Sequence, residues 1–374
     1  MSKMPRLRLA VVASLALALA HAGGAFAATV EVRPLYYKPV HEGDEVRYEA
    51  EPGERNRPVI TVAADSVVIT DAVDLDAGRG CVAEAGGAVR CTPTPNLEVV
   101  IRVLLGDSDD RVRVAGSAFA TLKGGPGNDR LIGSPDWPRG TLFDGGPGND
   151  RMLGGRASDR FVEGSAANGA DTMASLLNGA GAVDGVDYSR RRGAVHVSLD
   201  GRRDDGEAGE RDLIGPNVHE VEAGHGADVL SGGPENDRLE GHDGRDRLSG
   251  KGGDDYLNGD PWVVELPRSA DRVDGGPGDD ILEGGAGPDR INGGLGEDSI
   301  AAGPGDDRVF VSDGQMDFVG CGGNRDWVDT DIRDLLNPDC ERRRLLQPDG
   351  DPGRAHALLG LADRVRAVVE DRRA

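Results

Sequence analysis

Residues 275–310 decide the fold, because they divide into four consecutive nonapeptides: GGPGDDILE (275–283), GGAGPDRIN (284–292), GGLGEDSIA (293–301) and AGPGDDRVF (302–310). Position six is aspartate and position eight is aliphatic in every copy, while glycine dominates positions one, two and four. A fixed period is typical of repeat proteins, in which each unit packs on its neighbours. The sequence therefore predicts a solenoid.

Further copies precede this stretch, at 232–240, 241–249 and 250–258, and earlier ones begin at Gly124 and Gly145. Some copies depart from the pattern. Glu235 replaces the glycine at position four, Arg156 and Ala157 disrupt the turn that begins at Gly154, and insertions occupy 133–144 and 259–270. Aspartate keeps position six throughout, and a degenerate copy that begins at Leu266 still carries Asp271.

Each position of the nonapeptide has a physical role. Glycines at positions one, two and four allow positive φ in a tight turn and a close approach to an ion. Aspartate supplies the hard carboxylate oxygen that calcium prefers. Positions seven to nine form a short strand whose aliphatic residue points inward, and two nonapeptides make one coil, with coils stacked about 4.8 Å apart. Aspartates on one side then face the same gap, which pairs Asp237 with Asp255, Asp228 with Asp246, Asp280 with Asp298, and Asp289 with Asp307.

These copies resemble the GGxGxDxUx nonapeptide of the RTX, or hemolysin-type calcium-binding, repeat family. The resemblance covers roughly residues 124–162 and 223–310. It implies an all-β, right-handed parallel β-roll, with Ca²⁺ held between adjacent turns by aspartate carboxylates and turn carbonyls. The metal ligands it implies are Asp129, Asp150, Asp159, Asp228, Asp237, Asp246, Asp255, Asp271, Asp280, Asp289, Asp298 and Asp307.

The expected organisation has seven parts. A signal peptide (1–27) is followed by a β-rich N-terminal cap or lead-in (28–123), a first repeat array (124–173), an interrupting β module (174–222), the main arrays (223–310), a disulfide-tied C-terminal cap (311–345) and a tail with a short helix from Gly353 (346–374). The interrupting module is expected to contain short strands at 195–199 and 218–222 around an acidic, glycine-bearing loop at 200–209. This module and the cap resemble segments of exported bacterial proteins that carry such repeats. The N-terminal region has strand patterns at 59–70 and 99–114, and a ligand-binding domain is the alternative interpretation there.

The N-terminus predicts export. Lys3, Arg6 and Arg8 precede an apolar run of about twelve residues, too short for a membrane span, and Ala25–Ala27 offers a small-residue cleavage site. Removal of residues 1–27 takes away three positive charges and changes the net charge from −23 to −26. Such a chain repels nucleic acid and anionic lipid and attracts cations. No other stretch is apolar enough to span a bilayer.

Four cysteines remain after this cleavage, at positions 81, 91, 321 and 340. In an exported chain an even number indicates disulfides, and three pairings are open. The nearest-neighbour pairing, Cys81 with Cys91 and Cys321 with Cys340, is the expected one. A zinc site is the alternative, but the chain has no C-x₂-C pair.

Catalytic motifs are absent from the sequence. A zinc protease needs HExxH on a helix, whereas His219 and His225 are six residues apart in a predicted strand. We expect both histidines to be surface residues. Neither a GxSxG nucleophile elbow nor a phosphate-binding GxxxxGK[ST] loop occurs.

Three hypotheses follow for the function. The first is a calcium-stabilised extracellular protein, not an enzyme, with a structural or adhesive role and a cell-surface or matrix partner. The second is an exported, hydrolase-like enzyme with unrecognised catalytic residues, for which the repeats are a calcium-dependent folding module. The third is a calcium-buffering or matrix-assembly protein.

Overall fold

The computed structural model describes residues 27–37, 40–135, 140–175, 182–260 and 269–346. All regular structure in these ranges is β-strand, which confirms the all-β prediction. These ranges contain no helix that is long and apolar enough to cross a membrane. The predicted signal peptide, apart from Ala27, and the predicted C-terminal helix lie outside the described residues.

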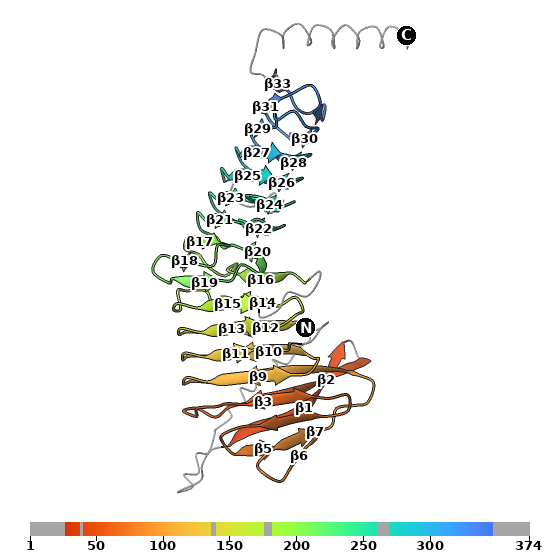
Figure 1. Ribbon diagram of the computed structural model, residues 1–374, viewed down its shortest axis with the longest axis vertical. Helices are drawn as coiled ribbons and strands as arrows, with labels where there is room; N and C mark the ends of the chain where they lie inside the picture. Colours follow the sequence, from red (N-terminus) through yellow and green to blue (C-terminus); the bar gives the residue numbers. More distant parts are fainter. Residues whose placement is uncertain (1–26, 38–39, 136–139, 176–181, 261–268, 347–374) are drawn as a thin grey trace, which may run out of the picture.

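The strands stack into a long column with two faces (Figure 1). From β8 to β32, neighbouring strands of the first face are all parallel, as predicted for a β-roll. In spatial order this face contains β5 (Leu75–Ala77), β1 (Ala28–Tyr37), β2 (Val40–Glu49), β8 (Glu98–Leu104), β10 (Phe119–Lys123), β12 (Thr141–Asp144), β14 (Arg160–Val162), β16 (Asp184–Asp187), β20 (Val218–Glu222), β22 (Arg238–Glu240), β24 (Tyr256–Asn258), β26 (Ile281–Glu283), β28 (Ser299–Ala301), β30 (Phe318–Gly320) and β32 (Leu335–Leu336).

The second face is built from the alternate strands of each coil. It contains β3 (Val59–Val62), β4 (Val67–Thr70), β6 (Cys81–Ala83), β7 (Val89–Cys91), β9 (Arg111–Ala115), β11 (Arg130–Ile132), β13 (Arg151–Gly154), β15 (Thr172–Ser175), β17 (Val195–Ser198), β18 (Arg203–Glu207), β19 (Asp212–Ile214), β21 (Val229–Ser231), β23 (Arg247–Ser249), β25 (Arg272–Pro277), β27 (Arg290–Leu295), β29 (Arg308–Phe310), β31 (Trp327–Thr330) and β33 (Arg342–Leu345).

The core is a double row of position-eight side chains. Leu239, Leu257 and Leu282 follow one another along the first face, and Leu248 and Val273 do the same along the second. All five are buried, while position seven in these strands is exposed or half-buried. Because each short strand buries little more than one aliphatic side chain, stacking of the coils supplies the core.

The turn glycines fulfil two different roles. At positions two and four, as in Gly276 (φ 113°) and Gly278 (φ 143°), the backbone takes the positive φ that glycine allows. Gly275, at position one, does not, so the prediction of positive φ at this position is wrong. A methyl group there would overlap Oδ2 of Asp280 and the carbonyl oxygen of Gly293. Position one therefore needs glycine for space.

The region before the first repeat is stacked directly on the roll. β1 and β2 form an antiparallel pair, and β2 continues in parallel with β8. Residues 59–70 and 99–114 each form two strands rather than one: β3 and β4 are an antiparallel hairpin, and β8 and β9 lie on different faces. The turn at residues 63–66 reverses the chain between β3 and β4, and the turn at residues 105–110 leads from β8 to β9 on the other face. Each predicted strand is therefore divided in two.

Covalent bonds close both ends of the column. Cys81 and Cys91 join the antiparallel strands β6 and β7, with 4.0 Å between their Cα atoms. Cys321 and Cys340 are joined in the last coils, with a Cα separation of 5.1 Å. Both predicted pairings are confirmed.

The interruption is folded into the same column. β17 and β20 agree with the strands predicted at 195–199 and 218–222. Residues 200–209, predicted to be an acidic loop, contain β18, which is antiparallel to both β17 and β19. β16 pairs in parallel with β14 and β20, so the first face continues past the interruption.

Candidate calcium site

Buried aspartates form two columns along the roll. Most of these residues stand directly before a strand, and Asp184 and Asp212 are the first residues of β16 and β19. The first column lies at the start of strands of the first face and contains Asp159, Asp184, Asp237, Asp255, Asp280, Asp298, Asp317 and the half-buried Asp334; the second lies at the start of strands of the second face and contains Asp110, Asp129, Asp150, Asp171, Asp212, Asp228, Asp246, Asp271, Asp289, Asp307 and Asp326.

One carboxylate oxygen of each aspartate ties neighbouring coils together. The backbone N–H of Asp237 donates to Oδ1 of Asp255 at 2.8 Å, and that of Asp280 donates to Oδ1 of Asp298 at 2.9 Å. The predicted pairs Asp228 with Asp246 (2.7 Å) and Asp289 with Asp307 (2.8 Å) have the same geometry. Asp271, from the degenerate copy, joins Asp246 to Asp289 in the second column.

The other oxygen, Oδ2, is buried and accepts no hydrogen bond in most of these residues. This holds for Asp110, Asp129, Asp150, Asp246, Asp255, Asp271, Asp280, Asp289, Asp307, Asp317 and Asp326. In Asp159, Asp228 and Asp237 the same atom instead accepts a backbone N–H from its own turn. A buried acceptor without a partner costs about 1–3 kcal/mol, and more when it is charged. The ladder therefore leaves, in most coils, an unpaired carboxylate oxygen that a cation could bind.

Several of the unpaired oxygens lie beside a main-chain carbonyl of the next coil, namely those of Asp129, Asp246, Asp255, Asp271, Asp280 and Asp289. The space beside Gly275 is bounded by Oδ2 of Asp280 and the carbonyl oxygen of Gly293, and the space beside Gly250 by Oδ2 of Asp255 and the carbonyl oxygen of Gly275. Carboxylate and carbonyl oxygens are the hard ligands that Ca²⁺ selects. The donor set thus fits calcium, with ligands contributed by two successive coils.

Burial makes the charged form of these carboxyls unfavourable. Desolvation is the main cause that raises the pKa of Asp280 to about 7, of Asp246 to about 8 and of Asp289 to about 9, and neighbouring aspartates of the column add to it. The hydrogen bond to Oδ1 acts in the opposite direction. Without a bound cation, ionised aspartates of the same column repel one another, and this repulsion destabilises the folded state.

The predicted ligands all fall within the two columns, but the columns are longer than predicted. The additional residues are Asp110, Asp171, Asp184, Asp212, Asp317, Asp326 and Asp334. Their turns lack the GGxG pattern, which is why the period missed them. An aspartate two residues before an apolar residue, as in Asp110-Arg-Val112 and Asp317-Phe-Val319, is the signal that could have found most of them.

His219 continues the first column in a different way. Its ring Nδ1 lies 2.9 Å from Oδ1 of Asp237. In later coils the corresponding Oδ1 accepts a backbone N–H instead, as Asp255 does from Asp237. His219 lies on β20, as the predicted strand requires, but it is half-buried, so the prediction of a surface residue is wrong for it. His225 is exposed and contacts Asp243.

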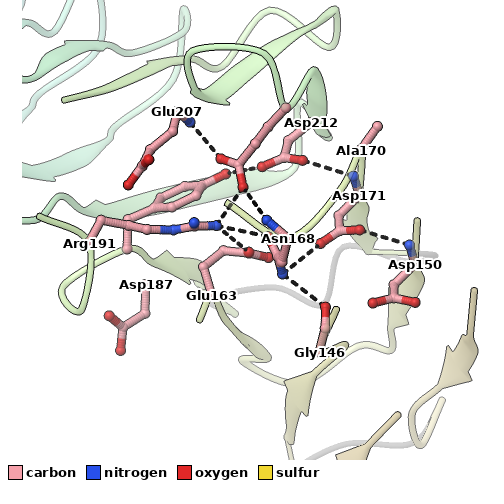
Figure 2. Close-up of polar contacts among 12 residues, drawn as sticks. Gly146, Asp150, Glu163, Asn168, Ala170, Asp171, Asp187, Arg191, Glu207 and Asp212 are labelled. Atoms are coloured by element: carbon pink, nitrogen blue, oxygen red, sulfur yellow. Dashed lines mark hydrogen bonds and ion pairs between the residues drawn. The ribbon is translucent and has the colours of Figure 1, made fainter. Parts of the chain in front are cut away.

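A buried arginine lies where the interruption meets the first array (Figure 2). Nη2 of Arg191 contacts Glu163 Oε2 at 3.0 Å, Glu210 Oε1 at 2.7 Å and Asn168 Oδ1 at 2.8 Å. Oxygens of Glu163, Glu210 and Asp212 lie within 4.8 Å of one another, and Tyr188 donates its hydroxyl to Asp212 at 2.9 Å. The guanidinium of Arg191 therefore neutralises this acidic cluster from within the chain. The unpaired Oδ2 atoms of the two columns have no such partner.

Four segments match the family of the RTX calcium-binding nonapeptide repeat, at residues 115–136, 142–161, 222–259 and 270–314. This chain carries RTX repeats. All twelve predicted ligands lie within the matched segments, and the additional column residues lie outside them. No curated protein matches the chain. RTX repeats bind calcium in a β-roll, which agrees with the fold and with the unpaired oxygens of the columns.

Replacing Asp280 by asparagine tests the role of Oδ2. Asparagine keeps the Oδ1 acceptor for its ladder hydrogen bond but replaces Oδ2 by an amide, which cannot bind a metal. In calcium about 100-fold above its Kd, Asp280→Asn should lower the free energy of unfolding by up to about 2.7 kcal/mol through loss of one ion. In chelator the same variant should be as stable as wild type or more stable. Denaturant unfolding measures both.

The matched control is Asp279→Asn, one residue away. Asp279 is exposed, and its Oδ1 accepts the N–H of Glu297 at 2.8 Å, a bond that asparagine retains. This variant removes the same charge and should leave the calcium-dependent stability almost unchanged. Equal losses from the two variants would mean that general acidity binds the metal, and the column would have no special role.

The raised pKa values predict an unusual pH dependence in chelator. Asp129, Asp280 and Asp289 have an ordinary pKa of 3.8 and folded pKa values of about 6, 7 and 9, so between these limits the folded state holds more protons than the unfolded state. Stability should therefore fall as pH rises through this window. The metal-free roll should be more stable near pH 5 than near pH 8 in denaturant titrations. Stability that is constant or rises over this range would contradict the burial of these carboxyls.

Proposed function

We propose that this protein is secreted and serves a structural or adhesive role outside the cell, through a β-roll that calcium ions stabilise. The observation that carries the proposal is the run of buried Oδ2 atoms without a hydrogen-bond partner. Calcium would be held by Oδ2 of the position-six aspartates and by carbonyl oxygens of the position-one glycines, as beside Gly250 and Gly275. When bound, it neutralises the column and links successive coils.

Calcium suits these turns better than magnesium. The ligands are carboxylates and carbonyls on two separate coils, and Ca²⁺ accepts six to eight oxygens in variable geometry. Mg²⁺ demands near-ideal octahedral geometry and releases its water reluctantly. Extracellular calcium modules bind with Kd values of about 10⁻⁴–10⁻³ M, so calcium outside the cell would be the signal that completes the fold.

Export is supported by three features. Both disulfides close short loops, and such bonds persist in oxidising compartments. Proteins with RTX repeats are typically exported, and the N-terminal sequence has the order of a secretory signal. We expect the mature chain to begin at Ala28.

A structural role, and not catalysis, accounts for the recurring acidic pairs. In Asp279-Asp280 the first carboxylate is exposed and caps the N–H of Glu297, and the second is a member of the buried column. General acid–base chemistry instead needs two carboxyls that face one reacting group. This difference between the exposed and the buried carboxylate of a pair supports a scaffold with a cell-surface or matrix partner.

Calcium-dependent folding is the direct test of the proposal. Far-UV circular dichroism of the mature chain should show little β structure in excess chelator at neutral pH. The signal should rise steeply near millimolar calcium, because ions that bind only the folded state shift the equilibrium toward it. Magnesium at the same concentration should have little effect. A spectrum rich in β structure in chelator and unchanged by calcium would show that packing alone holds the roll.

A further inference from the structure

A row of arginines runs along the second face of the main arrays. Position seven is arginine in four successive strands of this face, β23, β25, β27 and β29. The strands are in register, so that Arg247 lies beside Arg272, Arg272 beside Arg290, and Arg290 beside Arg308. All four side chains are exposed. Adjacent strands lie about 4.8 Å apart, so the row presents one guanidinium per coil.

Within the part of the chain that the structure describes, no acidic partner explains the row. Among the described residues, the side chains of Arg247, Arg272 and Arg308 form no ion pair and no hydrogen bond, although the chain carries 66 acidic residues. Arg290 has a cation–π contact, with its guanidinium 4.1 Å from the ring centre of Phe310. Like charges on neighbouring strands destabilise a sheet. An anionic ligand would remove this cost.

The repeat itself does not dictate arginine at position seven. On the first face of the same coils this position is occupied by Arg238, Tyr256, Ile281 and Ser299. Arg238, the one arginine of that set, is paired with Glu240 and lies 4.3 Å from the ring centre of Tyr256. The row of unpaired arginines is therefore a property of one face.

Two hollows lie along the row, and Arg308 and Asp306 line both of them. The first has a volume of about 580 Å³ and is lined by Arg245 together with the four arginines of the row. The second has a volume of about 550 Å³ and is lined by Arg308, Arg325, Arg342, Phe310 and Trp327. Trp327 is next in register after Arg308 and is 41% exposed. Together they form an extended groove with basic walls and aromatic rings at one end, which we call the arginine groove.

We propose that the arginine groove binds an unbranched acidic polysaccharide. A guanidinium donates two parallel hydrogen bonds to a carboxylate or sulfate, and the row repeats this donor at each coil. Sugar rings present apolar faces that stack on aromatic side chains such as Trp327. A regular row of equal charges fits a regular polymer better than a folded partner with a single acidic patch.

A nucleic acid is the less favoured polyanion. Binding of nucleic acid relies on a broad basic field that neutralises many phosphates, whereas here the basic groups are confined to one line. The exposed aromatic residues also lie at one end of the groove, so they do not form a continuous platform for stacked bases.

Polysaccharide binding should depend on calcium, and in this respect the inference rests on the proposed function. Asp228, Asp246, Asp271 and Asp289 of the second column line the first hollow beside the arginines. Without a bound cation these carboxylates repel an anionic polymer, and the roll that aligns the arginines lacks its stabilising ions. Calcium would therefore neutralise the floor of the groove and hold the row in register.

The test is fluorescence anisotropy of a labelled hyaluronan oligosaccharide, titrated with the mature chain in millimolar calcium, with a heparin oligosaccharide as the sulfated probe. Binding of at least one of the two, weakened by salt, is expected. Arg272→Gln and Arg308→Gln break no ion pair or hydrogen bond among the described residues, and each should weaken binding roughly tenfold, as expected for the loss of a charge-assisted hydrogen bond. Arg238→Gln, at the same position on the first face, is the matched control and should bind like wild type.

Several results would overturn the inference. These are no binding of either acidic probe, equal binding of neutral maltohexaose, equal effects of the Arg272 and Arg238 variants, or tighter binding of oligothymidylate, which would favour nucleic acid. Circular dichroism of the same samples separates the two proposals. A roll that folds with calcium but binds neither probe contradicts the arginine groove alone. A roll that folds without calcium and binds hyaluronan through Arg272 contradicts the calcium proposal alone.

Discussion

A buried aspartate carboxylate in each turn is the feature on which the rest of the structure depends. Oδ1 accepts the N–H of the aspartate one coil earlier, so the columns set the register of both faces. The same burial leaves Oδ2 without a partner and raises the pKa of the group, as for Asp280 and Asp289. The group that orders the stack therefore also destabilises it until a cation binds, which couples folding to calcium.

The small core explains why the protein needs this coupling. A strand such as β24 or β26 buries one leucine, and glycine-rich turns lose much conformational entropy on folding. The ends of such a column also expose strand edges that could pair with other chains. Here β1 and β2 cover the start of the column, the disulfide Cys321–Cys340 closes its last coils, and Arg191 neutralises the acidic cluster at the interruption.

The nine-residue period was sufficient to predict the parallel strands, the inward position eight and the four aspartate pairs, because these depend on local repetition. It could not predict Asp171 or Asp326, whose turns lack the glycine pattern but stack on the same ladder. The Arg191 cluster was also missed, because its partners at 163 and 210 are far apart in sequence and meet only through the stacking of coils. The pattern at 99–114 read as one strand because both halves are apolar, and the turn at 105–110 sends them to opposite faces.

The most direct test of this account is a crystal structure of the mature chain grown with calcium, with an anomalous difference map to locate the ions. We predict peaks in series along both columns, each beside Oδ2 of a position-six aspartate and the carbonyl oxygen of a position-one glycine, as at Asp280 and Gly293. Peaks confined to exposed carboxylates such as Asp279, or turns without peaks in saturating calcium, would contradict the claim that the unpaired oxygens are the calcium ligands.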